Sequence, residues 1–200
     1  MKKNNIMTST SIFASVMALA ISGQSMAEDD KEKNKYDTTC PQAVMDNAGM
    51  RFGDGSGAMT ECLGVRDNLP IVVAFNSGVI NGRNGHGQQV LNVRNLRNDY
   101  VNNYDMALGS EFNVAVVGYA AGARWLLNDT AFTNSYGTEN PSDQIVSDLI
   151  AKGVTFFMCQ NTMRGNGWTK YDLIEGVMMV PAGVTAVIDY QNRGYSYIAP

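Results

Sequence analysis

Apolar runs and amphipathic segments alternate along the chain from residue 70 onward. The runs have the apolar, β-branched and aromatic character of buried strands. They are residues 71–78, 112–117, 154–159, 176–181 and 195–198. Helical spacing or helix start signals fall between them, at residues 88–104, 118–127, 143–151, 169–175 and 182–191. Because crossovers between parallel strands are right-handed, this alternation predicts a mainly parallel sheet of about five strands with helices on both faces.

Two polar stretches interrupt this alternation. Residues 128–140 predict a polar loop of lid-like length, and residues 163–168 predict an exposed turn after the third strand. Thr169 caps the helix that follows, with Asp172 at capping-box spacing. No internal repeat is visible, so we expect residues 70–200 to form one α/β domain.

Residues 1–27 have the three parts of a secretory signal peptide. Lys2 and Lys3 precede an apolar core at residues 12–21, and Ser25-Met26-Ala27 stands before an acidic stretch. The apolar core is too short to span a bilayer. We therefore expect cleavage and a periplasmic location, with full export and an uncleaved signal anchor as alternatives. Residues 28–69 then form a partly irregular N-terminal extension.

Charge and hydropathy argue against two kinds of partner. The chain has 15 basic and 19 acidic residues, and removing Lys2 and Lys3 leaves 13 against 19, a formal charge of −6. Nucleic-acid binding needs clustered Lys and Arg to neutralise phosphates, and the sequence has no such cluster. No second apolar stretch of membrane length follows the signal, so we expect no membrane partner after its cleavage.

A cysteine, Cys159, ends the third predicted strand. The carboxyl edge of a parallel sheet is where ligands and chemistry collect, because the loops there face a common crevice and helices point their N-termini at it. A thiol at this edge is a candidate reactive group. The alternative is that Cys159 is a small buried hydrophobic residue, as most free cysteines are.

Three cysteines in an exported chain are an odd number. Cys40 and Cys62 both lie in the extension, so the simplest pairing is a disulfide between them that leaves Cys159 unpaired. A bond from Cys159 to one of the other two, three reduced thiols, and a thiol–disulfide role shared by all three remain open. None of the three belongs to a CxxC motif, so thioredoxin-type redox chemistry has no local support.

Four polar side chains are candidates to assist the Cys159 thiol. Asn161 and Thr162 could donate to the sulfur or to a bound oxyanion such as thiosulfate, or could simply cap the turn. Arg164 is the nearest cation in sequence, or a solvated surface charge. His86 could serve as a base if the loop after the first strand reaches the same sheet edge, and is otherwise a surface histidine.

Other chemistry has little support. With His86 as the only histidine, a His-based metal cluster is not expected, and we predict no metal and no cofactor. The absence of a Gly-x-Ser-x-Gly elbow, or of Gly-x-Gly-x-x-Gly after a strand, argues against a serine hydrolase and a dinucleotide site. The glycine-rich residues 51–57 lack the ending of a phosphate-binding loop. Four aromatic residues could line a pocket or a subunit interface: Tyr119, Trp125, Trp168 and Tyr171.

Several motifs, in order, resemble the DsrE/DsrF-like family. They are residues 153–162 around Cys159, Asp172-Leu173, residues 180–184 and residues 191–200. The resemblance covers about residues 70–200. It implies a flavodoxin-like three-layer α/β/α fold, homo-oligomers such as trimers or hexamers, and a link to sulfur metabolism in which some members carry sulfur on a cysteine as a persulfide. Cys159 is the residue that would inherit that role.

Two functional hypotheses follow. The leading one is a periplasmic DsrE-like sulfur carrier or sulfurtransferase-type protein, with Cys159 as persulfide acceptor and a sulfur donor or acceptor protein, or a small sulfur compound, as partner. The alternative is a non-catalytic oligomeric binding module of the same fold in which Cys159 is structural. Alkylation of the folded protein separates them, because a reactive thiol is labelled fast and an inert buried one is protected until denaturation.

Overall fold

A computed structural model describes residues 68–200. The signal peptide, the extension up to residue 67, and Cys40 and Cys62 lie outside the described residues. The elements are β1 (Leu69–Phe75), α2 (Gln88–Asn102), β2 (Phe112–Gly118), η1 (Ala120–Leu126), α3 (Asp129–Tyr136), α4 (Asp143–Ala151), β3 (Thr155–Cys159), α5 (Gln160–Asn166), η2 (Lys170–Asp172), β4 (Met178–Val180), α6 (Gly183–Asn192) and β5 (Ser196–Ile198). Among residues 68–200, no helix has both the length and the apolar character needed to cross a bilayer.

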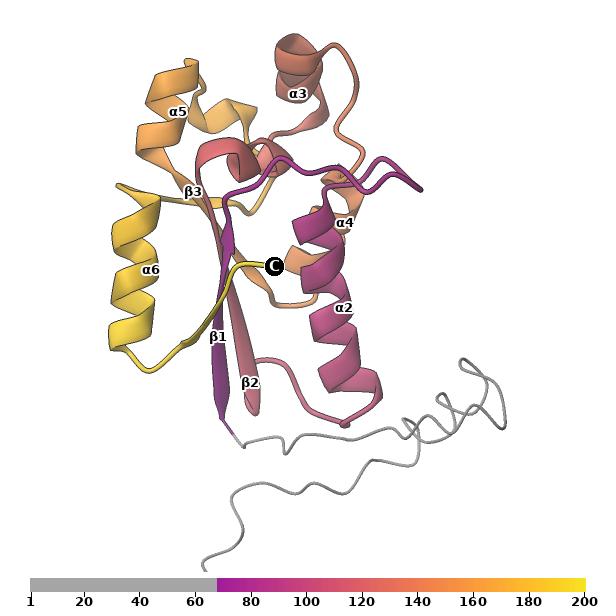
Figure 1. Ribbon diagram of the computed structural model, residues 1–200, viewed down its shortest axis with the longest axis vertical. Helices are drawn as coiled ribbons and strands as arrows, with labels where there is room; N and C mark the ends of the chain where they lie inside the picture. Colours follow the sequence, from indigo (N-terminus) through magenta and orange to yellow (C-terminus); the bar gives the residue numbers. More distant parts are fainter. Residues whose placement is uncertain (1–67) are drawn as a thin grey trace, which may run out of the picture. The chain divides into compact units, whose positions relative to one another are not determined.

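The five strands form one parallel sheet in the order β4-β3-β2-β1-β5. From β1 to β4 each strand adds to the same side of its predecessor, and the connection through α6 then returns across the sheet to β5. Figure 1 shows α6 on one face of the sheet and α2 and α4 on the other. The fold is thus the flavodoxin-like three-layer α/β/α arrangement, and the prediction of about five mainly parallel strands is confirmed.

Each face of the sheet has its own core. Along β1, Ile71, Val73 and Phe75 point into a large core under α2, α4 and η1, where the Phe75 ring meets that of Phe156 edge-on. Val72 and Ala74 point to the other face and belong to a smaller core under α6. Burial on both faces explains why these strands are continuous apolar runs rather than alternating ones.

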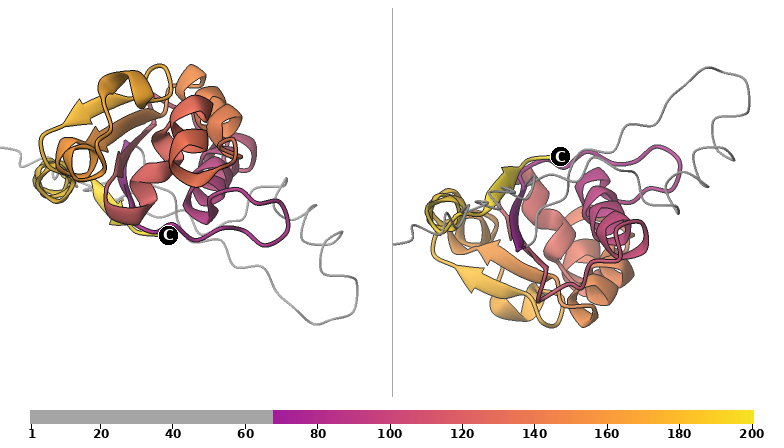
Figure 2. Two further views of the ribbon diagram at one scale, coloured as in Figure 1. Left: turned by 90° about the horizontal axis from the view of Figure 1, so that it is seen from above. Right: turned by 90° about the horizontal axis from the view of Figure 1, so that it is seen from below.

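The segment after β2 passes very close to the end of β1. A Cβ on Gly122 would lie 2.3 Å from the carbonyl carbon of Phe75, so only glycine fits at this position of η1. Seen end-on in Figure 2, η1 and the neighbouring helices gather over one end of the sheet. The glycines and alanines within residues 118–123 therefore bring the backbone of η1 against the carboxyl edge of the strands.

Two predicted polar stretches are helical, and one predicted helix is only a turn. The lid-like loop at 128–140 contains α3, which begins at an Asn128 side chain that accepts the N–H of Ala131 and ends at Gly137 with φ 79°. The predicted turn at 163–168 is largely occupied by α5, which ends at Gly167 with φ 72°. The Thr169–Asp172 capping box is present, but the helix that it begins is only the short η2, because the chain is extended again at Leu173.

Candidate functional site

Cys159 stands between the starts of two helices. It is the last residue of β3 and immediately precedes α5. In the sheet it lies opposite Val180, the last residue of β4, and three residues further along the chain α6 begins. The parallel register therefore brings the beginnings of α5 and α6 to the same sulfur atom, at the carboxyl edge of the sheet. The residue is only 4% exposed.

The first N–H of α6 donates a hydrogen bond to this sulfur. The distance from the Gly183 nitrogen to Cys159 Sγ is 3.1 Å. A Cβ on Gly183 would lie 2.7 Å from the Cβ of Tyr119 and 2.9 Å from its ring. The absence of a side chain at Gly183 thus allows Tyr119, which follows β2, to pack against the helix start without displacing the N–H from the sulfur.

Thr162, in the first turn of α5, connects the sulfur to the segment after β2. Its hydroxyl oxygen accepts the backbone N–H of Ala120 at 3.1 Å, and hydrogen bonding between the same hydroxyl and the Cys159 sulfur lowers the pKa of the thiol. A hydroxyl has one proton to donate and can accept as well, so both interactions are compatible. Ala120 has φ 48°, in the left-handed region that a non-glycine residue seldom adopts. The site thereby joins the ends of β2, β3 and β4.

The environment of the sulfur favours the thiolate. Burial raises the pKa of the Cys159 thiol, because a charged sulfur is poorly solvated there. This effect is outweighed by hydrogen bonds that lower the pKa: they come from the Thr162 hydroxyl and from the backbone N–H groups of Thr162, Gly183 and Asn161. The net result is a pKa below the ordinary value of a thiol. A thiolate is the form of cysteine that acts as a nucleophile.

The side chains of Asn161 and Arg164 pair with each other. The guanidinium of Arg164 donates to the Asn161 side-chain oxygen, and both residues are exposed on α5. Asn161 acts on the sulfur through its backbone N–H instead. The predicted site residues Asn161 and Thr162 therefore lie at Cys159, whereas the Arg164 guanidinium is engaged on the outer surface of the short helix.

The structure does not bring His86 to Cys159. The loop between β1 and α2 extends over the side of the sheet that carries α2 and α4, away from α5 and α6 (Figures 1 and 2). There Gly87 donates its N–H to Ser142 Oγ at the start of α4, and its Cα packs on the Trp125 ring. The Nδ1 atom of His86 is buried without a hydrogen-bond partner. A role as base for Cys159 therefore has no structural support.

Sequence reasoning did not identify three contributors to the site: Tyr119, Ala120 and Gly183. Gly183 was expected to open a helix, and Tyr119 to line a pocket or an interface. A usable signal was present, because Pro181-Ala182-Gly183 follows the strand that neighbours the cysteine strand in the sheet. Within residues 68–200, no three His, Cys, Asp or Glu side chains gather closely enough to hold a metal ion.

Fold and site together define a class: a parallel α/β protein with one thiol of lowered pKa at the carboxyl edge of its sheet. The model of the DsrE/DsrF-like family matches residues 99–200, about half of the chain, and the protein belongs to this family. A search among curated proteins finds no significant match. One similar solved structure is a protein of unknown function, MTH1491, from Methanobacterium thermoautotrophicum, with 27% identity and a TM-score of 0.48, covering 67% of this chain and 99% of that chain.

Proposed function

We propose that this protein is a sulfur carrier or sulfurtransferase-type member of the DsrE/DsrF-like family, and that Cys159 accepts sulfur as a persulfide. The observation that supports the proposal most is the set of donors around one sulfur: the Gly183 N–H at 3.1 Å, the Thr162 hydroxyl, and the N–H groups at the start of α5. These donors stabilise negative charge at the position where a nucleophile is needed.

The transfer conserves atoms and charge. The Cys159 thiolate attacks the outer sulfur of a donor persulfide, R–S–S⁻; a new S–S bond forms at Sγ, the donor's S–S bond breaks, and R–S⁻ leaves after any proton exchange with water. With thiosulfate the leaving group is sulfite. In both cases one sulfur atom moves without its bonding electron pair, so no external oxidant or reductant is required.

The proposal includes a homo-oligomer, as a trimer or hexamer. Val184 and Ile188 are 58% and 49% exposed and lie four residues apart on the outer face of α6. Exposed apolar residues at this spacing form one continuous strip, which in soluble proteins commonly packs against another subunit. Light scattering on the purified chain tests this, and Ile188→Asp is expected to yield the monomer, since it places a charge in the strip.

The proposal also includes export to the periplasm. It rests on the signal-like residues 1–27, and N-terminal sequencing of the protein recovered from a periplasmic extract tests it. An N-terminus at Glu28 is the expected result. An intact Met1 in a cytoplasmic fraction would contradict it. The sulfur donor and acceptor are proposed to be another protein or a small sulfur compound of the same compartment.

Mass spectrometry tests the sulfur-carrier role. After incubation with polysulfide or thiosulfate, the protein is expected to gain the mass of one sulfur atom, located on the peptide that contains Cys159 and removed by dithiothreitol. Cys159→Ser is the matched control, because it keeps a small hydrogen-bonding side chain while losing the nucleophile. An equal gain in that variant, or no gain with either donor, would contradict the proposal.

One observation favours the second hypothesis, a binding module with a structural cysteine. Cys159 is only 4% exposed, and a thiol this buried reacts slowly unless the site opens. Iodoacetamide labelling separates the two hypotheses. Labelling of the folded protein faster than that of a free thiol at the same pH supports the carrier, and protection until urea unfolds the chain supports the binding module.

A further inference from the structure

A second group of polar and aromatic side chains surrounds Arg124, in η1. Its guanidinium carbon lies 4.1 Å from the ring centre of Tyr136, 4.8 Å from that of Trp125 and 5.3 Å from that of Phe132. The Trp125 and Phe132 rings stack with their centres 5.9 Å apart. Three rings from η1 and α3 therefore enclose one cation. We refer to these four residues as the Arg124 cluster.

The guanidinium of Arg124 has no acidic partner within residues 68–200; its close neighbours there are the three rings. Its Nε is buried without a hydrogen-bond partner, and its stem lies against Gly78 in the loop after β1. The side chain as a whole is half-buried, so the terminal nitrogens beyond Nε are the part that reaches solvent. A cation is thus fixed in position with its terminal donors unused.

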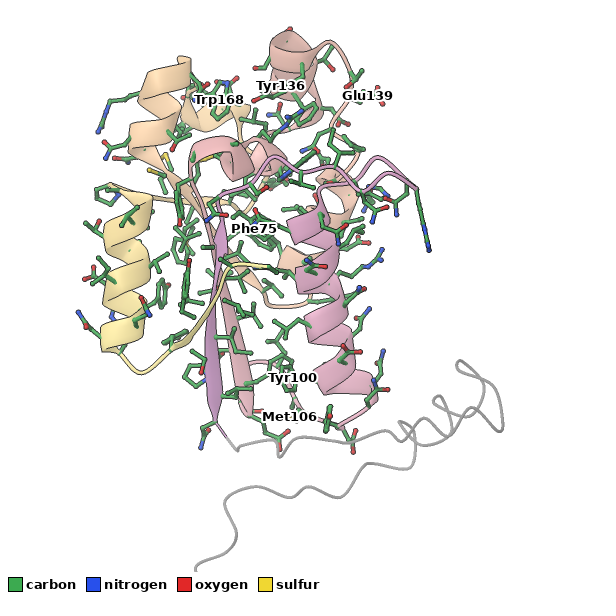
Figure 3. All side chains as sticks on the ribbon, viewed as in Figure 1. Phe75, Tyr100, Met106, Tyr136, Glu139 and Trp168 are labelled. Carbon is green, nitrogen blue, oxygen red and sulfur yellow. The ribbon has the colours of Figure 1, made fainter. Side chains whose placement is uncertain are left out.

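This arrangement is suited to an anion. Rings that cover a guanidinium remove water from it and hold it in one orientation, so little freedom is lost when its edge binds a ligand. The edge of a guanidinium presents parallel N–H groups that match two oxygens of a carboxylate or an oxyanion. The Arg124 cluster also lies beyond the carboxyl ends of the strands, where Figure 3 shows Tyr136, and this edge is the usual location of ligands in such sheets.

We propose that the Arg124 cluster is an anion-binding site that takes a ligand through two oxygens of a carboxylate or of a sulfur or phosphorus oxyanion. The site is separate from Cys159: η1 spans the two, and from Ala120 to Arg124 it rises about 8 Å at 2 Å per residue. The inference does not rest on the proposed sulfur chemistry. Sulfate, thiosulfate, inorganic phosphate and acetate are the probes that distinguish the sources of the anionic group.

The fluorescence of Trp125 can report anion binding at the Arg124 cluster directly. The chain has two tryptophans, and Trp168→Phe leaves Trp125 as the only indole emitter. Cys159→Ser in the same protein prevents reaction of thiosulfate at that residue, so failure of the sulfur-carrier proposal would not affect this experiment. Titration of each anion at constant ionic strength, with chloride as the balancing salt, is expected to give a saturable change in Trp125 emission for at least one probe.

Arg124→Gln tests the residue, and Arg97→Gln is its matched control. Arg97 also has a buried, unpartnered Nε, but it lies on α2, where its terminal nitrogen donates to Asn98. Arg124→Gln is expected to raise the dissociation constant at least tenfold, whereas Arg97→Gln leaves it within twofold. The proposal is overturned if no anion gives saturation beyond chloride, or if the two variants weaken binding equally.

Should Arg124→Gln fail to fold, as judged by circular dichroism, Arg124→Lys carries the test. Lysine keeps the positive charge but lacks the two-pronged donor edge. Binding weakened several-fold supports the proposed geometry, and unchanged binding contradicts it.

Discussion

Replacement of Thr162 by valine isolates the contribution of one hydroxyl to the reactivity of Cys159. Valine has nearly the shape of threonine but neither donates to Sγ nor accepts the N–H of Ala120. The other donors to the sulfur, including the Gly183 N–H at 3.1 Å, remain in place. The substitution therefore weakens the stabilisation of the thiolate without removing it.

The magnitude follows from the strength of a hydrogen bond to a charged group. Such a bond contributes about 1.5 to 3 kcal/mol, and the lower end applies to Thr162 because other donors still reach the sulfur. A loss of about 1.4 kcal/mol corresponds to about a tenfold smaller thiolate population at a pH below the pKa. The Ala120 N–H is exposed to water, so we expect stability to fall by less than about 1 kcal/mol.

The assay is the rate of iodoacetamide labelling as a function of pH, in a Cys40→Ser/Cys62→Ser background. The Thr162→Val curve is expected to lie about tenfold below the parent at low pH and to meet it at high pH, where both thiols are ionised. Thr162→Ser keeps the hydroxyl and should follow the parent. Equal curves for the valine variant and the parent would refute the argument that the Thr162 hydroxyl stabilises the thiolate.

Three further predictions concern stability and the site. Because the pKa of Cys159 is lowered on folding, ionisation of this thiol stabilises the folded protein. The stabilisation is complete above the ordinary thiol pKa of about 8.5 and is lost as the pH falls through the pKa of the folded state. The difference in the free energy of urea unfolding between the parent and Cys159→Ser should therefore grow as the pH rises toward about 8.5. Gly183→Ala should displace the start of α6 and lower the free energy of unfolding by about 1 to 3 kcal/mol, because the new methyl group meets the Cβ of Tyr119. Adding Tyr119→Gly should relieve this clash, whereas adding Tyr119→Ala should not, because alanine keeps the Cβ. Thermal melts of the two double variants would check this. Gln89→Leu should lower the free energy of unfolding by about 2 to 4 kcal/mol in chemical denaturation. The buried side-chain amide donates to the carbonyl oxygens of Ala74 at 3.0 Å and Pro200 at 2.9 Å, and its oxygen accepts the N–H of Ser77. A loss below about 0.5 kcal/mol would contradict this account.

The strands could be predicted from the sequence because both faces of the sheet are buried. Burial on both faces requires continuous apolar runs, and residues 71–75 and 114–117 have that composition. The helix α3 could not be predicted in the same way: only Ala131 and Phe132 of its residues are buried, so it has no apolar periodicity. Its evidence in the sequence was confined to its ends, at Asn128 and Gly137.

The candidate site could likewise be predicted only in part. The position of Cys159 at a strand end follows from local sequence. Its partner Gly183 lies 24 residues away and reaches the sulfur only because β3 and β4 are neighbours in register. Conversely, Arg164 is close in sequence but bonds to Asn161 on the outer side of α5. Nearness along the chain was therefore a poor guide to contact, while the strand order, once known, was a good one.

The helix that shields the smaller core is also the helix whose first N–H holds the sulfur. Ala186 and Val187 anchor α6 on the sheet, and Gly183 lies one turn before them. Local detachment of this helix would remove the Gly183 donor while the larger core stays intact. The temperature range in which the cysteine remains acidic should therefore be narrower than the range in which the domain remains folded.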